Sequence, residues 1–259
     1  MKSQYPFILV HGVALKDFLF FKAFGRIGKM LEKEGYRVYT ARTDAFGTIE
    51  TNAAQLKSEM EKLLRDTGAE KVNIIAHSKG GLDARYMIEH LGMEGKVASL
   101  TTLCTPHRGS ALASRILRLP EFVLHILDFV LNLVYRIGGD KHPSALAVCR
   151  QLKAVPAEEW KNLHVSDEVY CQSYSAVLEE KRADFVRDVP LMYFRTFQDG
   201  PSDGMVSVES AKYGNYRGDC LEESVSHSEI VDLMTKKKKK EKIFGFYRNL
   251  CADLAERGF

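Results

Sequence analysis

Ser78 stands in a sequence context that could make its hydroxyl group reactive. It follows an apolar run at 72–76 and is followed by a helix-like segment at 81–90. A serine on a tight turn between a strand and a helix exposes its hydroxyl, and the free N–H groups at the helix end suit an oxyanion. Such a turn needs small residues two positions before and after the serine, which here are Ala76 and Gly80. The pattern predicts a nucleophilic serine.

A serine hydroxyl needs a neighbouring base at neutral pH. On this kind of turn the reactive residues follow each other along the chain as serine, then acid, then histidine. The chain contains eight histidines, and only His227 follows the run at 191–197, which we predict to be the strand before the acid. We therefore predict His227, in the loop segment SVSHSEIVD, as the base.

The acid should lie in the loop after that strand. Asp199 and Asp203 both qualify by position, and an Asx turn is the structural alternative for either. The acid has to orient the imidazole and stabilise its cationic form, which requires a semi-buried loop. Position alone gives only a slight preference to Asp203, the first residue of DGMVS.

These residues belong to an alternating pattern of strands and helices. Short apolar runs predict buried strands at 7–10, 36–41, 72–76 and 98–104. Amphipathic or polar stretches predict helices at 20–34, 50–67, 81–90 and 242–257. The alternation predicts an α/β fold with a mostly parallel central sheet and helices on both faces. It stops after Gly109, so we predict a core of residues 1–109 and 191–259 with an inserted, mainly helical cap at 110–190.

Composition excludes several classes of protein. Hydrophobic residues make up 45% of the 259 residues, which excludes a disordered chain. The formal net charge of +3 is too small to indicate a nucleic-acid partner. Five widely spaced cysteines without a CxxC pair indicate neither a disulfide framework nor a zinc site. The N-terminal segment does not read as a secretory signal, so we expect a cytoplasmic location.

Two segments suggest contact with lipid. The stretch 123–137 predicts a helix whose polar residues form one stripe, with apolar residues over most of its remaining surface. Such a helix is either buried inside the cap or serves as a lid that covers the serine and opens onto lipid. The five lysines at 236–240 are either a solvated surface turn or a contact with an anionic membrane.

The segments that carry these residues resemble the bacterial triacylglycerol lipases of the α/β-hydrolase fold. They occur in the family's order: YPFILVHG at 5–12, KVNIIAHSKGG at 71–81, TPHRGS at 105–110, DGMVS at 203–207 and the loop around His227. The resemblance implies Ser78 as nucleophile, Asp203 as acid and His227 as base. It also implies an oxyanion hole made by the backbone N–H groups of Val13 and Lys79. Because these donors are main-chain groups, we expect the side chains at both positions to matter little.

The chain departs from the family at two positions that bear on the site. The turn before the serine has Ala76 where the family usually has glycine, and the small size is kept. Many relatives hold a structural calcium partly through an aspartate two residues after the histidine, and here that position is Glu229. We predict no metal and no organic cofactor.

These observations predict a lipase-like serine hydrolase that cleaves carboxylic esters with a hydrophobic acyl group. An acyltransferase or a thioesterase could use the same three side chains. Two alternatives come from other classes of protein. One is a protein that binds lipid without catalysis, and the other is a peripheral membrane protein that binds through the lysine run.

Overall fold

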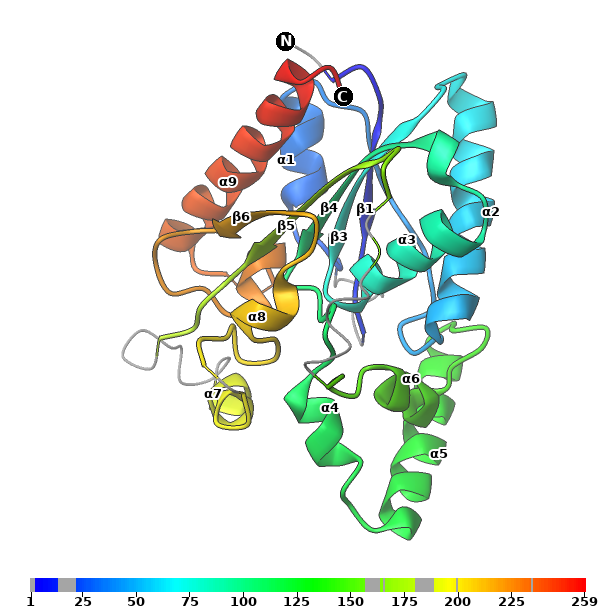
Figure 1. Ribbon diagram of the computed structural model, residues 1–259, viewed down its shortest axis with the longest axis vertical. Helices are drawn as coiled ribbons and strands as arrows, with labels where there is room; N and C mark the ends of the chain where they lie inside the picture. Colours follow the sequence, from blue (N-terminus) through cyan, green and yellow to red (C-terminus); the bar gives the residue numbers. More distant parts are fainter. Residues whose placement is uncertain are drawn as a thin grey trace.

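The computed structural model contains a six-stranded sheet in which every paired strand is parallel to its neighbour (Figure 1). It describes residues 3–13, 22–156, 164, 166–179, 189–198, 200–233 and 235–259. The strands lie in the order β2-β1-β3-β4-β5-β6. Their bounds are Phe7–Val10 (β1), Val38–Thr40 (β2), Val72–His77 (β3), Val97–Leu103 (β4), Tyr170–Ser175 (β5) and Asn215–Asp219 (β6). The predicted parallel α/β sheet is confirmed.

Helices cover both faces of the sheet and create two cores. Helices α1 and α9 pack on one face, whereas α2 and α3 pack on the other (Figure 1). Successive side chains of a strand point to opposite faces, so Ile74 of β3 joins the core under α2 and α3 while Ile75 joins the other. The bounds of these helices are Ile27–Lys33 (α1), Ile49–Thr67 (α2), Lys79–His90 (α3) and Lys237–Glu256 (α9).

Strand register brings the predicted reactive segments together at the carboxyl edge of the sheet. Val10 of β1 lies beside Ala76 of β3, so the chain that follows β1 runs next to the turn at Ser78. On the other side, the backbone N–H of Ser78 donates to the carbonyl of Leu103 in β4. Open parallel sheets place their functional residues at this edge.

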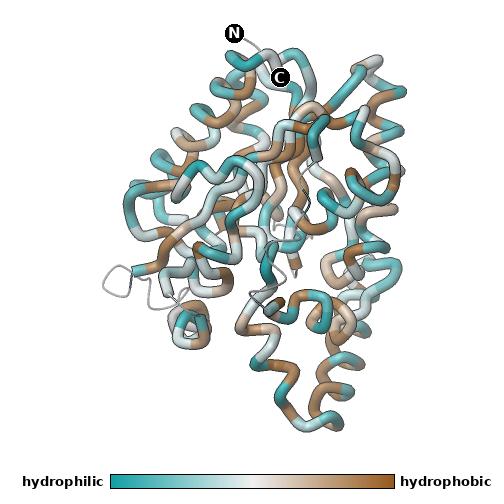
Figure 2. The backbone as a smooth tube through the Cα atoms, in the orientation of Figure 1, coloured by the Kyte–Doolittle hydropathy of each residue, from teal (hydrophilic) through white to brown (hydrophobic). Residues whose placement is uncertain are grey.

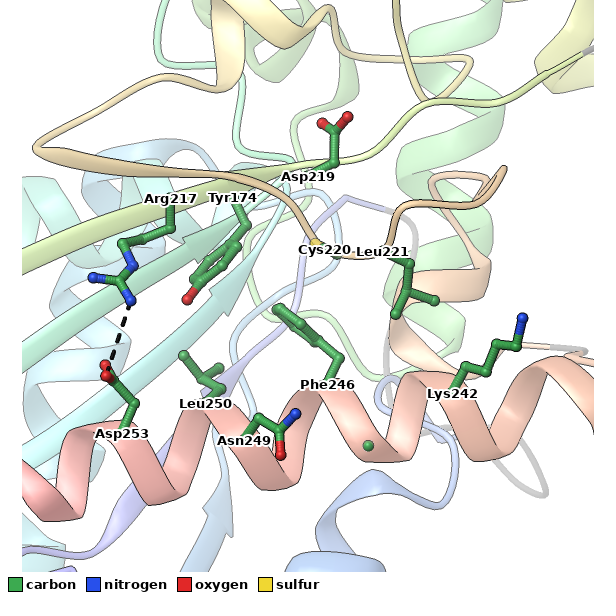
Figure 3. A pocket seen from close by; sticks show the side chains of 11 residues that line it. Tyr174, Arg217, Asp219, Cys220, Leu221, Lys242, Phe246, Asn249, Leu250 and Asp253 are labelled. Atoms are coloured by element: carbon green, nitrogen blue, oxygen red, sulfur yellow. Dashed lines mark ion pairs between the residues drawn. The ribbon is translucent and has the colours of Figure 1, made fainter.

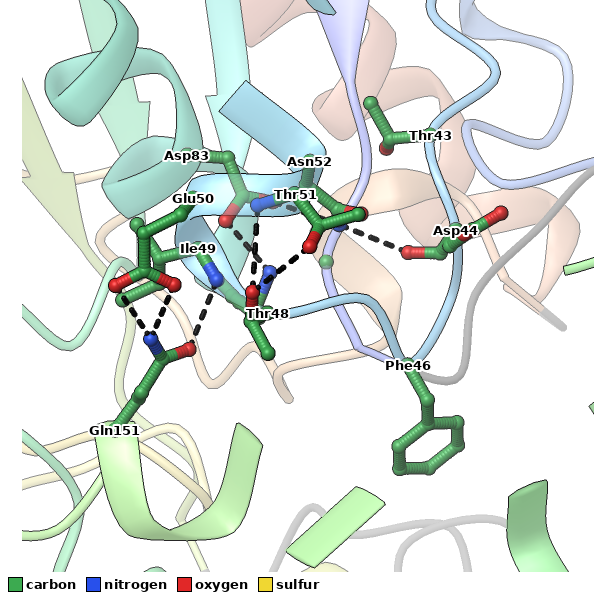
Figure 4. Close-up of polar contacts among 12 residues, drawn as sticks. Thr43, Asp44, Phe46, Thr48, Ile49, Glu50, Thr51, Asn52, Asp83 and Gln151 are labelled. Carbon is green, nitrogen blue, oxygen red and sulfur yellow. Dashed lines mark hydrogen bonds and ion pairs between the residues drawn. The ribbon is translucent and has the colours of Figure 1, made fainter. Parts of the chain in front are cut away.

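The cap begins after β4, and its described residues include three helices at the end of the molecule opposite the chain termini (Figure 1). They are α4 (Ala111–Ile116), α5 (Glu121–Ile137) and α6 (Ala145–Gln151). The side chain of Gln151 ties the end of α6 to the core, because its carbonyl accepts the N–H of Ile49 and its amide donates to Glu50 (Figure 4).

Two predictions about the second half of the chain are wrong. The run at 191–197 lies largely in helix α7 (Val189–Arg195), since a short apolar run does not distinguish a helix from a strand. The sheet resumes instead at β5, inside the segment predicted as cap, so the core restarts at residue 170 rather than at 191. Strand β5 has the polar sequence YCQSYS, and its buried Gln172 is satisfied by a hydrogen bond to Thr101 of β4.

The lysine run is not a surface turn. Helix α9 begins at Lys237, five residues before the predicted start, so most of the run forms the first turn of this helix. In the part of the chain that the structure describes, the other short elements are α8 (Val208–Ala211) and the 3-10 helices Glu94–Lys96 and Glu229–Val231. Within the described ranges, none of the helices has the length and hydrophobicity needed to cross a bilayer.

Candidate active site

Ser78 occupies a strained turn between β3 and α3. Its backbone has φ 54° and ψ −134°, a conformation that is costly for a residue with a Cβ. The turn is closely packed, because a Cβ added at Gly80 would lie 2.4 Å from the carbonyl oxygen of His11. The predicted sharp strand-to-helix turn, and the need for a small residue two positions after the serine, therefore agree with the geometry.

The segment after β1 approaches the serine from the other side. A Cβ added at Gly12 would lie 2.5 Å from the Cβ of Ser78 and 3.0 Å from its Oγ. Val13, the next residue, lines the same cavity as Ser78. On the helix side, Lys79 is the first residue of α3, where backbone N–H groups have no partner inside the helix. The two predicted oxyanion donors thus belong to the segments that flank the serine.

His227 and Asp203 form a buried hydrogen-bonded pair. The Nδ1 of His227 donates to Oδ2 of Asp203 at 2.6 Å, and the two side chains are 8% and 1% exposed. The other carboxylate oxygen of Asp203 accepts the backbone N–H groups of Met205 and Val206. The carboxylate is therefore fixed, and it leaves Nε2 of His227 as the ring nitrogen available to the serine. The alternative acid, Asp199, lies outside the described residues.

Ser78 and His227 line the same cavity. Among the described residues, no hydrogen bond joins the Ser78 hydroxyl to the His227 ring, whose Nδ1 is bound to Asp203. Hydrogen bonds between catalytic groups are often long in free enzymes and tighten when substrate binds. The ring of His77 packs against that of His227, with the centroids 4.5 Å apart. Burial, and then the neighbouring His227, lower the pKa of His77 well below its ordinary value, so His77 supports the base as a neutral ring.

The side chain of Lys79 is bound inside the protein. Its ammonium lies 2.6 Å from Oδ1 of Asp83, and both side chains are 1% exposed. Burial raises the pKa of Asp83 to about 6, while the Lys79 charge acts in the opposite direction. The expectation that the Lys79 side chain matters little is wrong, because a buried charge needs its partner.

A polar network extends from this ion pair to the cap. The amide of Asn52 donates to the second carboxylate oxygen of Asp83 and to the carbonyl of Asp44 (Figure 4). The carboxylate of Asp44 in turn accepts the backbone N–H groups of Lys141 and His142, just beyond helix α5. The end of the cap helix is thereby attached to the element that carries the oxyanion donor Lys79.

The cavity beside Ser78 is apolar and has a volume of about 500 Å³. Most of the residues that line it belong to the cap, including Leu112, Ile116, Leu124, Leu131, Val148 and Leu152. A second cavity of about 390 Å³ lies between β6 and α9, where Arg217 pairs with Asp253 (Figure 3). It contains none of the predicted reactive residues, so of these two cavities the first fits the predicted chemistry.

Cys104, at the end of β4, lies beside the acid and was not predicted to belong to the site. Ligand atoms of Cys104, Asp203 and His227 lie within 4.8 Å of one another, a spacing that could hold a metal ion. The thiol of Cys220, burial and the Asp203 carboxylate raise the pKa of Cys104 well above its ordinary value. A metal requires the thiolate, so a hydrogen-bonded cluster suits these residues better. The absence of a metal from the reaction stays a prediction.

Similarity to known proteins decides the family. A model of the palmitoyl protein thioesterase family matches residues 6–180, more than half of the chain. The chain belongs to this family. It is also 28% identical over 264 residues to triacylglycerol lipase 2 of Saccharomyces cerevisiae, which covers 90% of this chain and 73% of the yeast protein. A triacylglycerol lipase of Vibrio cholerae is 39% identical over 113 residues, or 43% of this chain and 36% of that protein.

Solved structures of similar fold are lipases and esterases. The lipase of Staphylococcus hyicus superposes with a TM-score of 0.71 at 16% identity, covering 98% of this chain and 96% of that one. A metagenomic carboxyl esterase superposes with a TM-score of 0.75 at 15% identity, covering 98% of this chain and 77% of that one. The predicted α/β-hydrolase fold and the resemblance to bacterial lipases are confirmed. The named relatives of this family member also confirm the predicted enzyme class, a serine hydrolase of carboxylic esters.

Proposed function

We propose that the chain hydrolyses esters of hydrophobic acyl groups through an acyl-enzyme on Ser78. The observation that carries this proposal is the buried Asp203–His227 pair on the wall of an apolar cavity that Ser78 also lines. The strained turn at Ser78 supports it, because strain of this kind is retained where an exposed hydroxyl is needed.

The reaction proceeds in two halves. The Oγ of Ser78 attacks the ester carbonyl carbon while Nε2 of His227 takes the hydroxyl proton, and the N–H groups of Val13 and Lys79 hold the oxyanion. The bond to the alcohol then breaks, and His227 gives its proton to the departing oxygen. Water attacks the acyl-enzyme in the same way, with His227 as base, and the acid leaves as Ser78 regains its proton. Asp203 orients the imidazole and stabilises its cation throughout.

The cavity supports an acyl chain as the group that enters it. Its lining is mostly apolar, so it favours a hydrophobic chain through burial of surface rather than through hydrogen bonds. Pockets of this type discriminate weakly between chains that differ by one or two methylenes. We therefore propose a broad acceptance of acyl lengths.

Helix α5 supports contact with a lipid surface, because large apolar side chains cover much of its solvent-facing side. The side chains of Asp128 and Asn132 face inward and accept the first backbone N–H groups of α6. Large apolar side chains face solvent instead, among them Phe122 and Phe129 at 68% and 69% exposure. Figure 2 shows this concentration of hydrophobic residues along α5, at the free end of the cap. The exposed apolar side of α5 can bury itself in a lipid–water interface beside the cavity.

The test of catalysis is the variant Ser78→Ala on p-nitrophenyl butyrate and palmitate. Turnover should fall by about 10⁴-fold or more, and a fluorophosphonate probe should no longer label the protein. The control is Ser58→Ala, on the exposed side of α2, which should keep parental turnover and labelling. If Ser78→Ala keeps its activity, the mechanism is wrong. If the parent neither turns over esters nor reacts with the probe, it binds lipid without catalysis.

A thioester is the second candidate substrate, favoured by the family model that matches residues 6–180. The same three side chains serve a thioester, because the thiolate is a better leaving group than the alkoxide. The ratio of kcat/KM for palmitoyl-CoA or an S-palmitoyl peptide to that for a palmitate oxygen ester decides between them. A ratio well above that of the uncatalysed reactions favours the thioesterase.

A further inference from the structure

The loop that carries His227 contains a buried carboxylate for which the proposed mechanism has no use. Glu229 is 2% exposed and begins the short 3-10 helix that follows the histidine. Its Oε2 accepts the backbone N–H of Ser226 at 3.1 Å. Ser226 is the residue directly before His227, so this carboxylate constrains the main chain on which the imidazole is mounted.

Lys239 supplies the positive charge for this carboxylate. Its ammonium lies 2.6 Å from Oε2 of Glu229, and its side chain is 20% exposed. A buried carboxylate that loses a charged partner costs several kcal/mol, so the ion pair helps to keep Glu229 inside. Helix α9 is thereby connected to the backbone at the histidine through the buried side chain of Glu229.

The lysine run has two kinds of members. The side chains of Lys236, Lys237 and Lys238 are exposed, whereas those of Lys239 and Lys240 are partly buried. Lys240 lies beside Glu241 and over the ring of Phe244, and Lys239 alone of these two contacts Glu229 among the described residues. The first turn of α9 has no acidic residue, and a cation at a helix N-terminus is unfavourable by about 0.3–1 kcal/mol. Lys239 therefore does not stabilise its own helix, and the contact with Glu229 accounts for its position.

The far end of the same loop is held by a second ion pair. The carboxylate of Asp232 accepts three N–H groups of Arg26, at 2.6, 2.7 and 3.0 Å. Asp232 has φ 58°, so the chain reverses sharply there. With this end fixed on the residue before α1, the contact of Lys239 with Glu229 acts on the end that carries His227, together with the hydrogen bond from the His227 backbone N–H to the carbonyl of Asp203.

We propose that Lys239 is a positioning residue for the reaction. Through Glu229 it holds the main chain at Ser226, and so keeps the imidazole of His227 aligned with Asp203 and with the bound ester. It touches no reacting atom. This inference rests on the proposed function, since it requires His227 to act as the base.

The decisive variant is Lys239→Met, compared with Lys238→Met, which removes the same charge from an exposed neighbour. Turnover of p-nitrophenyl butyrate is divided by the concentration of sites that a fluorophosphonate probe labels, so that unfolded protein is not counted. A displacement of the base by about 1 Å lowers kcat by about 10- to 100-fold. We expect that loss for Lys239→Met with KM changed by less than about twofold. We expect no change for Lys238→Met, and recovery of most activity in Lys239→Arg.

The route through Glu229 is tested by a double-mutant cycle. Glu229→Gln should lower kcat per labelled site in the same way, and the double variant with Lys239→Met should lose no more than the worse single variant. Losses that add would mean that the two side chains act separately, which would overturn the proposed route.

Two further results would overturn the proposal. One is a kcat per labelled site in Lys239→Met that equals the parent's, even if less protein folds, because the pair would then serve stability alone. The other is an equal loss in Lys238→Met, which would indicate a general effect of charge. Failure of the proposed function is recognised separately, by turnover that survives in Ser78→Ala.

Discussion

On the core side of the cavity the reactive groups are held by main-chain geometry and buried polar contacts, whereas the cap side offers aliphatic side chains. Around Ser78 the fit is so close that Gly12 and Gly80 leave no room for a Cβ. Across the cavity, helix α5 has only Leu124 buried and exposes large apolar side chains to solvent. From this difference we expect substitutions on the core side to affect catalysis and folding. We expect substitutions on the cap side to affect which substrates bind and how they reach the site.

The largest effect is expected for Gly12→Ala. The new methyl group would meet the Cβ of Ser78 at 2.5 Å, and the strained turn there cannot yield easily. The segment bearing the Val13 N–H has to move, and loss of one oxyanion donor costs about 10²- to 10³-fold in kcat. Steady-state kinetics on p-nitrophenyl butyrate measure it. The control is Gly95→Ala, where nothing lies within 4 Å. A kcat for Gly12→Ala close to that of Gly95→Ala would show that the segment after β1 can accommodate a methyl group without displacing the Val13 N–H.

Next comes the buried pair of Lys79 and Asp83. Replacing either one alone, as Lys79→Met or Asp83→Leu, should lower the free energy of unfolding by about 3–5 kcal/mol, because an unpaired charge remains buried. The double variant should be much closer to the parent than the sum of the singles. Urea denaturation of all four proteins gives the comparison. Strict additivity would mean that the pair is not a unit.

A smaller effect is expected from pH. Burial raises the pKa of Asp83 to about 6 from an ordinary value near 3.8, so between pH 4 and 6 the folded protein holds this proton more tightly than the unfolded chain. The contribution of Asp83 to stability therefore decreases as pH rises from 4 through 6, because the neutral carboxyl group can still accept the hydrogen bond of Lys79 whereas its buried ionised form has lost the solvation that it has in the unfolded chain. The stability of the parent minus that of Asp83→Asn should decline across this window. A difference that is flat or that rises with pH contradicts the shift.

The smallest effect on stability is expected for a substitution on the exposed side of the cap. Phe129→Ser should change the free energy of unfolding by no more than about 0.5 kcal/mol, because the ring is 69% exposed. Cleavage of soluble p-nitrophenyl acetate should be unaffected. Partition onto phospholipid vesicles, measured by co-sedimentation, should fall by about tenfold, since one buried aromatic ring contributes about 1.5–3 kcal/mol. Tyr39→Ser, on the edge strand β2, serves as the control. Equal partition of the two variants would argue against α5 as the lipid contact.

Strands β1, β3 and β4 could be predicted because they are short apolar runs buried on both faces. The edge strand β2 could be predicted from the run at 36–41 as well, although it is only half-buried. Strands β5 and β6 could not, because their buried positions include Gln172 and Ser173 and the edge strand exposes Arg217. These polar residues are tolerated only through partners on other strands, such as Thr101 for Gln172. Which residues become partners depends on the order of the strands in the folded sheet, and the sequence alone does not give that order. For the same reason the apolar run at 191–197 was predicted to be a strand, although its contacts in the fold are those of a helix.

For the site, the strand-to-helix pattern and the order along the chain were enough to select Ser78 and His227, whereas the choice of Asp203 over Asp199 came mainly from the family resemblance. The supports of these residues were not predictable in the same way. Glu229 lies ten residues from Lys239, and nothing in the run of five lysines distinguishes the one that contacts this carboxylate. The burial of the Lys79 side chain likewise depends on how α3 packs on α2, which no local pattern records.

The exposed apolar side of helix α5 also has a cost in plain water. Two molecules can bury these apolar sides against each other, so self-association should compete with adsorption to droplets or bilayers. Concentrated stocks would then hold a dormant pool that dilution or a mild detergent releases, and the apparent specific activity on emulsions should rise as the enzyme is diluted.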